Sequence, residues 1–225
     1  MQKPGFLAIF LCLCWATPWA QPDCSGRGGI DGVVLDLEGR PVAGAKVSIL
    51  SEECAVTGIE PTATSDDQGH FLLRGAPTGL DGVYAQKPEA GYPDTTAAIY
   101  LDDSAPPPKV TVRSGETVTG VVVRLGNKAG LISGEVVDEG TSQPVVTARI
   151  RISIPDNDRI MLSMGTDGTG HFHLLLPSRL VNFEVRAPGY KAWQFMGAQG
   201  PPGIIHLQPE EKRELIVRLQ KQRSD

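Results

Sequence analysis

The sequence predicts an all-β protein built from two tandem, seven-stranded antiparallel β-sandwiches with Greek-key connections. Many glycines and prolines separate short runs rich in β-branched residues, which is typical of such sandwiches. The order of these runs occurs twice along the chain. Each copy also contains a similar turn, Thr-Ser-Asp-Asp-Gln-Gly-His-Phe at residues 64–71 and Gly-Thr-Asp-Gly-Thr-Gly-His-Phe at residues 165–172. Each unit has about seven short strands, the number expected of a small sandwich.

The N-terminal segment predicts export. Lys3 precedes an apolar run over residues 6–15, and the segment ends in small residues at Ala16 and Ala20. That run is too short to span a bilayer, which is typical of a signal peptide. We therefore expect removal of residues 1–20 by cleavage near Ala20, which leaves a secreted, periplasmic or cell-envelope protein. No other stretch is long enough to cross a membrane, so no membrane span is expected.

Cleavage would leave two cysteines, Cys24 and Cys54. Two cysteines in an exported chain usually pair, so a disulfide is predicted between them. The closed loop of about 30 residues would contribute roughly 3–4 kcal/mol in the chain-entropy model. A catalytic cysteine with a histidine partner is the less favoured alternative.

The first unit, taken in order, alternates strand-like runs with turns. Its predicted strands are residues 30–36, 45–50, 71–73, 83–85, 97–101 and 118–125. A short segment, Gly-Asn-Lys-Ala-Gly at residues 126–130, then separates the two units. The predicted domains are residues 21–127 and 128–225.

The second unit repeats the same order. Its matching segments are residues 132–138, 144–150, the turn at 166–172, the Gly-Tyr pair at 189–190, and 215–219. Residues 210–220 are rich in good helix formers, so propensity alone would favour a helix there. Because this stretch occupies the position of residues 121–125 in the first unit, a final strand is predicted instead.

The repeated turn is explained by local backbone chemistry. Asp66 and Asp167 can each accept a hydrogen bond from the backbone two residues on, and Gly69 and Gly170 can supply a positive φ. Since both copies share these residues, we interpret them as structural turn residues.

These residues resemble the carboxypeptidase regulatory-like domain. The resemblance rests on Ile-Asp-Gly-Val-Val at residues 30–34, Pro-Val-Ala-Gly-Ala-Lys-Val at 41–47 and the turn at 64–71. A second copy resembles it at residues 132–136, 148–150, 166–172 and 187–190, but lacks the Gly-Ala pair after Pro144. The resemblance implies two tandem prealbumin-like (transthyretin-like) sandwiches of the carbohydrate-binding-like fold. It also implies non-catalytic modules.

Composition and motifs disfavour several function classes. The formal net charge is −5 with acids and bases interspersed, so no basic surface for nucleic acid is expected. The sequence contains no Gly-x-Ser-x-Gly, His-Glu-x-x-His, Cys-x-x-Cys or phosphate-loop motif. We predict that the protein is not an enzyme and has no cofactor.

A histidine pair offers a metal-binding alternative. His171 and His173 lie two residues apart, so they would share one face of a strand, a spacing that can hold a metal. However, His171 has a counterpart in His70, and His173 aligns with Leu72. The turn therefore explains the first histidine without a metal, and no metal site is predicted.

An aromatic cluster near residue 190 is the candidate binding site. Trp193 and Phe195 would point the same way on a strand, beside Tyr190 and Gln194. Such a face could stack on a sugar or a partner peptide. The alternative is that these aromatics fill the core of the second sandwich.

The sequence thus favours a secreted, non-catalytic module that interacts with an envelope or extracellular protein. The first alternative is carbohydrate binding through the face near Trp193, with a polysaccharide as partner. The remote alternative is a metal-dependent enzyme that uses His171 and His173.

Overall fold

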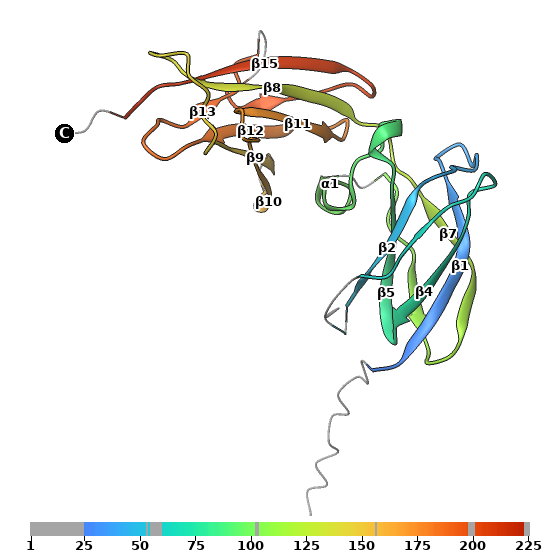
Figure 1. The fold of residues 1–225 in the computed structure, drawn as a ribbon. Helices are drawn as coiled ribbons and strands as arrows, with labels where there is room; N and C mark the ends of the chain where they lie inside the picture. The colour runs from blue at the N-terminus through green and yellow to red at the C-terminus, as the bar shows by residue number, and fades with distance from the viewer. Residues whose placement is uncertain are drawn as a thin grey trace, which may run out of the picture.

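A computed structural model describes residues 25–52, 54, 60–101, 104–155, 157–197 and 201–222. These residues form two β-sandwiches, one after the other along the chain. One short α-helix follows the fifth strand in the chain and lies between the two sandwiches in space (Figure 1). The predicted all-β fold class is confirmed. The predicted signal peptide and Cys24 lie outside the described residues. Within the described part of the chain, no helix has the length and apolar character needed to cross a membrane.

The first sandwich contains seven strands. They are β1 (Arg27–Leu35), β2 (Lys46–Ser51), β3 (Thr62–Thr64), β4 (His70–Pro77), β5 (Gly79–Gln86), β6 (Lys109–Val112) and β7 (Thr117–Arg124). One sheet has the order β4-β1-β7 and the other β3-β2-β5-β6. Alternate residues of both sheets, such as Ile30, Val47 and Leu73, form the core between them.

The second sandwich repeats this arrangement. Its strands are β8 (Gly130–Asp138), β9 (Arg149–Ile154), β10 (Asn157–Gly165), β11 (His171–Leu176), β12 (Val181–Arg186), β13 (Trp193–Gln194), β14 (Ile204–Ile205) and β15 (Lys212–Leu219). One sheet has the order β11-β8-β15, and the other β10-β9-β12-β13 with β14 also pairing β12. Phe172, Phe183 and Ile150 are among the buried core residues.

Two details of the predicted fold are wrong. The sandwiches are not purely antiparallel, because β1 pairs β7 and β8 pairs β15 in parallel. The second sandwich also has eight described strands rather than seven, since the two-residue strands β13 and β14 both pair with β12, on the edge opposite β9. Hairpin turns specify local antiparallel pairs, whereas the pairing of the first and last strands of each unit depends on tertiary packing.

A glycine permits each parallel pair. A Cβ added at Gly32 would lie 2.0 Å from the carbonyl oxygen of Val121, and one at Gly134 would lie 2.1 Å from that of Leu215. Any side chain at either position would therefore push the neighbouring strand away. This close approach explains the glycine that both copies carry in the middle of their first strand.

The predicted strand at residues 97–101 is wrong. These residues belong to the helix α1 (Thr95–Leu101), which follows a single 3-10 turn, η1 (Pro88–Ala90). The Asp94 carboxylate accepts the Ala97 N–H at 2.8 Å, and the Gln86 side-chain oxygen accepts the Thr95 N–H at 2.8 Å. A five-residue apolar run does not distinguish a strand from a helical turn, and the capping groups decide here.

The predicted final strand is confirmed. β15 runs parallel to β8 over its whole length, from Lys212 beside Leu131 to Leu219 beside Asp138. Its good helix formers do not prevent this, because one face of the strand packs into the core through Val217 and Leu219.

Candidate functional site

The two repeated turns have the same hydrogen-bond geometry. In the first, the Asp66 carboxylate accepts the backbone N–H groups of Gln68 at 3.0 Å and His70 at 2.8 Å. In the second, the Asp167 carboxylate accepts the N–H groups of Thr169 at 2.8 Å and His171 at 2.9 Å. Each carboxylate thus satisfies the backbone of its own turn.

The glycines of these turns connect them to the sheet. Gly69 has a φ of 77° and Gly170 a φ of 84°, and both lie in the left-handed region. Their carbonyl oxygens accept the N–H groups of Val34 at 2.8 Å and Val136 at 2.9 Å. The four residues predicted as structural turn residues are therefore held in backbone hydrogen bonds.

The acidity of Asp167 reflects the same contacts. Hydrogen bonds from the Thr169 hydroxyl and from the His171 and Thr169 N–H groups lower the pKa of Asp167 to about 2. The carboxylate therefore stays ionised at neutral pH as a hydrogen-bond acceptor, which suits a structural role.

A buried aspartate network was missed by the sequence analysis. Asp138 is buried at the end of β8, where its carboxylate accepts the Thr141 N–H at 2.8 Å and the Tyr190 hydroxyl at 2.9 Å. Lys221 Nζ lies 3.2 Å from the same carboxylate. These contacts, led by the Thr141 N–H, hold the pKa of Asp138 well below its usual range. The signal was present in the sequence, because Asp36 occupies the matching position of the first copy, directly after β1.

This network gives Tyr190 its position. Its hydroxyl bond to Asp138 raises the pKa of Tyr190, so the phenol remains a neutral donor. The equivalent Tyr92 of the first copy is buried, and burial raises its pKa as well. Tyr190 therefore attaches the loop after β12 to the end of β8, and the hydroxyl is engaged within the protein.

The other aromatic candidates lie against the core. Trp193 is half-buried, and its ring meets Phe183 edge to face at 6.4 Å between centroids and 84° between planes. Phe195 is also half-buried, with the Arg213 guanidinium 5.8 Å from its ring centroid. Gln194 is exposed between them. The structure thus does not bring the four candidates together on one exposed face.

Gln194 instead borders a polar hollow on the second sandwich. This pocket has a volume of about 420 Å³, and Arg151, Asn182 and Glu184 also line it. Glu184 lies 2.8 Å from Arg186 and 3.7 Å from Arg151, while the Asn182 amide donates to Ser153 at 3.1 Å. The hollow offers planar polar groups of the kind that bind hydroxyl-rich ligands.

Both histidines of the pair are exposed on β11. The His171 ring accepts from or donates to the Thr169 hydroxyl at 3.0 Å, and its other nitrogen lies 3.9 Å from Glu135. Across the described ranges, no three His, Cys, Asp or Glu side chains are grouped closely enough to hold a metal. His173, which has no counterpart in the first copy, lines a large groove instead.

This groove is larger than the polar hollow beside Gln194, and residues of both units line it. It has a volume of about 1010 Å³ and lies between the α1 region and the second sandwich. Its lining residues are Pro88, Glu89, Asp94, Thr96, Ala97, Tyr100, Leu131, Ile150, Ile152, Met161, Leu162, Ser163, Met164, His173, Leu174 and Leu175. Most of them are apolar, which is typical of binding sites rather than of solvated surface.

Exposed apolar side chains lie on both walls of the groove. Tyr100 of α1 is 49% exposed, and Met161 of β10 is 44% exposed. Figure 1 shows α1 between the two sandwiches, on the side of the second one where β10 and β11 lie. No local pattern in the sequence could have found this groove, because its walls come from both units.

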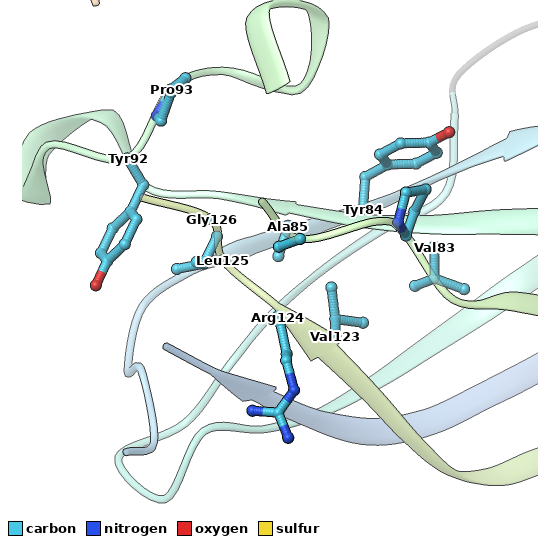
Figure 2. A pocket seen from close by; sticks show the side chains of 11 residues that line it. Val83, Tyr84, Ala85, Tyr92, Pro93, Val123, Arg124, Leu125 and Gly126 are labelled. Carbon is cyan, nitrogen blue, oxygen red and sulfur yellow. The ribbon is translucent and has the colours of Figure 1, made fainter. Parts of the chain in front are cut away.

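A third pocket, shown in Figure 2, is much smaller. It has a volume of about 30 Å³ in the first sandwich, where Tyr84, Tyr92 and Arg124 are among its lining residues. That volume has room for a water molecule but not for an organic ligand. We therefore take the groove as the candidate functional site.

Comparisons with known proteins found one family match and several distant matches to solved structures. A search of curated proteins found no match. Among solved structures, the chain is similar to the Bacillus anthracis TIE protein at 20% identity, covering 87% of this chain and 34% of that one, with a TM-score of 0.34. A streptococcal ancillary pilin matches at 14% identity, covering 88% of this chain and 63% of that one, with a TM-score of 0.34. The shaft pilin SpaA from Lactobacillus rhamnosus GG matches at 10% identity, covering 88% and 99%, with a TM-score of 0.35.

The chain therefore spans about a third of the TIE protein and under two thirds of the ancillary pilin. TM-scores at this level carry no conclusion about function. A family comparison is more specific, since the carboxypeptidase regulatory-like domain matches residues 29–126. The matched range begins within β1 and ends just after β7, so it covers the first sandwich. Residues 29–126 of this chain thus match the carboxypeptidase regulatory-like domain.

Proposed function

We propose that the chain is an exported, non-catalytic module that binds a protein of the cell envelope or extracellular space through the groove. In this proposal residues 1–20 are removed, and residues 21–127 and 128–225 are the two domains. The observation that carries it is the apolar groove of about 1010 Å³, whose walls expose Tyr100 and Met161. Contiguous apolar surface of this kind is characteristic of interaction sites.

Contacts between the first unit, the linker and the second sandwich support a preformed groove. Leu101 of α1 is fully buried and belongs to the core of the second sandwich, and the Arg179 guanidinium donates to its carbonyl oxygen at 3.1 Å. Lys128 Nζ lies 2.6 Å from Glu210, and the Ala129 N–H donates to the Gly91 carbonyl at 2.8 Å. A preformed site loses less conformational entropy on binding than one that must first assemble.

The composition of the groove supports binding rather than catalysis. Its polar lining residues are few, and apolar side chains from β8, β9, β10 and β11 form most of the floor. Aliphatic and methionine side chains supply contact area without proton-transfer or nucleophilic chemistry.

An apolar fluorescent dye tests the groove. Nile red, an uncharged dye, should bind the full chain, and Met161→Gln should weaken binding by about tenfold, because it places an amide on an apolar wall. Met196→Gln is the matched control, since Met196 is 71% exposed and does not line the groove. Equal dye affinity in both variants, or no binding to the native fold, would overturn the proposal.

A second candidate function is saccharide binding at the polar hollow beside Gln194. The hollow of about 420 Å³ and its Arg151, Asn182 and Glu184 side chains favour this candidate. Oligosaccharide titrations can be followed by the fluorescence of Trp193, which would be the sole tryptophan after cleavage near Ala20. A saturable change that Gln194→Ala abolishes would support this candidate. If no sugar changed the fluorescence of Trp193, this candidate function would be refuted.

The disulfide between Cys24 and Cys54 remains part of the proposal. Cys54 is buried after β2, with its sulfur 3.4 Å from the Thr78 carbonyl oxygen. Peptide mapping of the secreted chain with and without reductant would detect the linked pair, and two alkylated thiols in the unreduced sample would refute it.

A further inference from the structure

Two strand edges border the groove. β10 is the last strand of its sheet, with β9 as its neighbour on one side, and β11 is the last strand of the other sheet, next to β8. Both contribute groove-lining residues, Met161 to Met164 from β10 and His173 to Leu175 from β11. The groove is therefore the open side of the second sandwich, where its two sheets end.

Backbone groups are available along such an edge. In an antiparallel strand, alternate residues direct their N–H and C=O groups to one neighbour and the others direct theirs to the opposite side. The ladder between β10 and β9 places Leu162 beside Ile152 and Met164 beside Ile150. The outward half of the β10 backbone consequently faces away from β9, and an edge of this kind is a template for another strand.

An element from outside the sandwich already covers part of this opening. α1 contacts both β10 and β11, and its Leu101 is 0% exposed within the core of the second sandwich. In the first sandwich, the corresponding strands β3 and β4 lie against each other instead. The groove thus continues an existing interface in which an apolar side chain from a separate segment enters the same core.

The charge of the groove wall selects the partner. Glu89 and Asp94 line the side formed by η1 and α1, and the described lining residues include no Lys or Arg. The other titratable side chains of the described lining are His173, on the β11 side, and Tyr100 of α1. An occupant with a basic residue near η1 would meet complementary charge there.

We propose that the occupant is an extended segment of a partner protein that pairs with the β10 edge as an added strand. Alternate apolar side chains of this segment enter the groove, and a lysine or arginine faces Glu89. The described groove-lining part of β10, from Met161 to Met164, matches about four to six residues of added strand at roughly 3.3 Å per residue. This inference rests on the groove being the binding site of the proposed function.

A synthetic peptide tests strand addition directly. The probe alternates valine and threonine and carries one lysine at its N-terminal end. Two control peptides carry N-methyl groups on alternate residues, one set on the odd positions and the other on the even positions. Only one set removes the N–H groups that face β10, so one control should bind at least about tenfold more weakly than the probe while the other binds within about threefold of it.

Protein variants locate the bound peptide. Met161→Gln should weaken binding of the probe peptide, whereas Met196→Gln should not. Glu89→Gln should weaken binding of the lysine peptide by about threefold to tenfold. It should leave the affinity for a norleucine version of the peptide unchanged, because only the lysine interacts with the lost charge. Bound probe should also slow amide hydrogen exchange in residues 161–165, which a purely side-chain contact would not do.

The outcomes separate the two proposals. Dye binding that depends on Met161, together with equal affinity for both N-methylated peptides and the probe, would overturn strand addition and leave the groove as a binding site. The absence of Met161-dependent dye binding would overturn both. Binding of the probe with unchanged exchange in β10 but slowed exchange in β11 would place the added strand on the wrong edge and refute the inference as stated.

Discussion

Replacing Gly134 by alanine should destabilise the second sandwich selectively. The added Cβ would lie 2.1 Å from the Leu215 carbonyl oxygen and 3.1 Å from the Phe172 ring. Neither neighbour can yield easily, because Leu215 belongs to the parallel pair of β15 with β8 and Phe172 is buried in the core. Separating a Cβ and a carbonyl oxygen to an ordinary contact requires a strand displacement of about 1 Å.

The magnitude follows from what that displacement disrupts. Overpacking in a rigid core costs about 1–3 kcal/mol, and weakening about two ladder hydrogen bonds adds roughly 1 kcal/mol each. We therefore expect Gly134→Ala to lower the free energy of unfolding of the second sandwich by about 3–5 kcal/mol. For a unit of about 100 residues, this corresponds to a melting temperature lower by roughly 15–25 °C.

Scanning calorimetry of the full chain provides the assay. Gly134→Ala should shift the transition of the second sandwich, and Gly32→Ala should shift that of the first, because an added Cβ would lie 2.0 Å from the Val121 carbonyl oxygen there. Gly168→Ala is the matched control, since nothing lies within 4 Å of its added Cβ, and it should change stability by under about 0.5 kcal/mol. If Gly134→Ala and Gly168→Ala melted within a few degrees of each other, the close-approach explanation would be refuted.

Three further predictions concern single side chains. The pKa of Asp167 is about 2 in the fold against about 3.9 in an unfolded chain, which contributes stability above pH 4 that is lost as the pH falls toward 2. In thermal melts, the melting temperature of the Asp167→Asn variant should therefore fall less steeply at acid pH than that of the native chain. Parallel plots of melting temperature against pH for the two proteins would contradict this. Tyr190→Phe removes the donor to the buried Asp138 carboxylate, so the melting temperature of the second sandwich should fall by a few degrees, and an unchanged melt would mean that the bond is not made in solution. Leu101→Ala should cost the second sandwich about 2–4 kcal/mol although the residue lies between β5 and β6 of the first unit in the chain. Tyr100→Ala on the same helix should cost far less, and a loss of stability confined to the first sandwich would refute the docking of α1.

Much of the fold could be predicted from the sequence because the same order of strands and the same turn occur twice along the chain. The turn at Asp66 and Gly69 involves atoms no more than four residues apart, and its copy at Asp167 and Gly170 fixes the register of the second unit. The match between the two units also predicted correctly that residues 212–219 form a strand, although their composition favours a helix. Asp36 and Asp138 could have been found in the same way, since they occupy one position in both copies.

The sequence by itself therefore determined the sandwich class, the repeated order of strands and the chemistry of the turns, because these depend on local hydrogen bonds and on alternation along single strands. The tertiary structure alone decided that first and last strands pair in parallel, that residues 95–101 form a helix, and that Leu101 enters the second core. It also placed His173, Met161 and Tyr100 on one groove and turned Trp193 toward Phe183. Contacts between residues that are tens of positions apart have no local signature in the chain, because only close packing of the assembled units selects them.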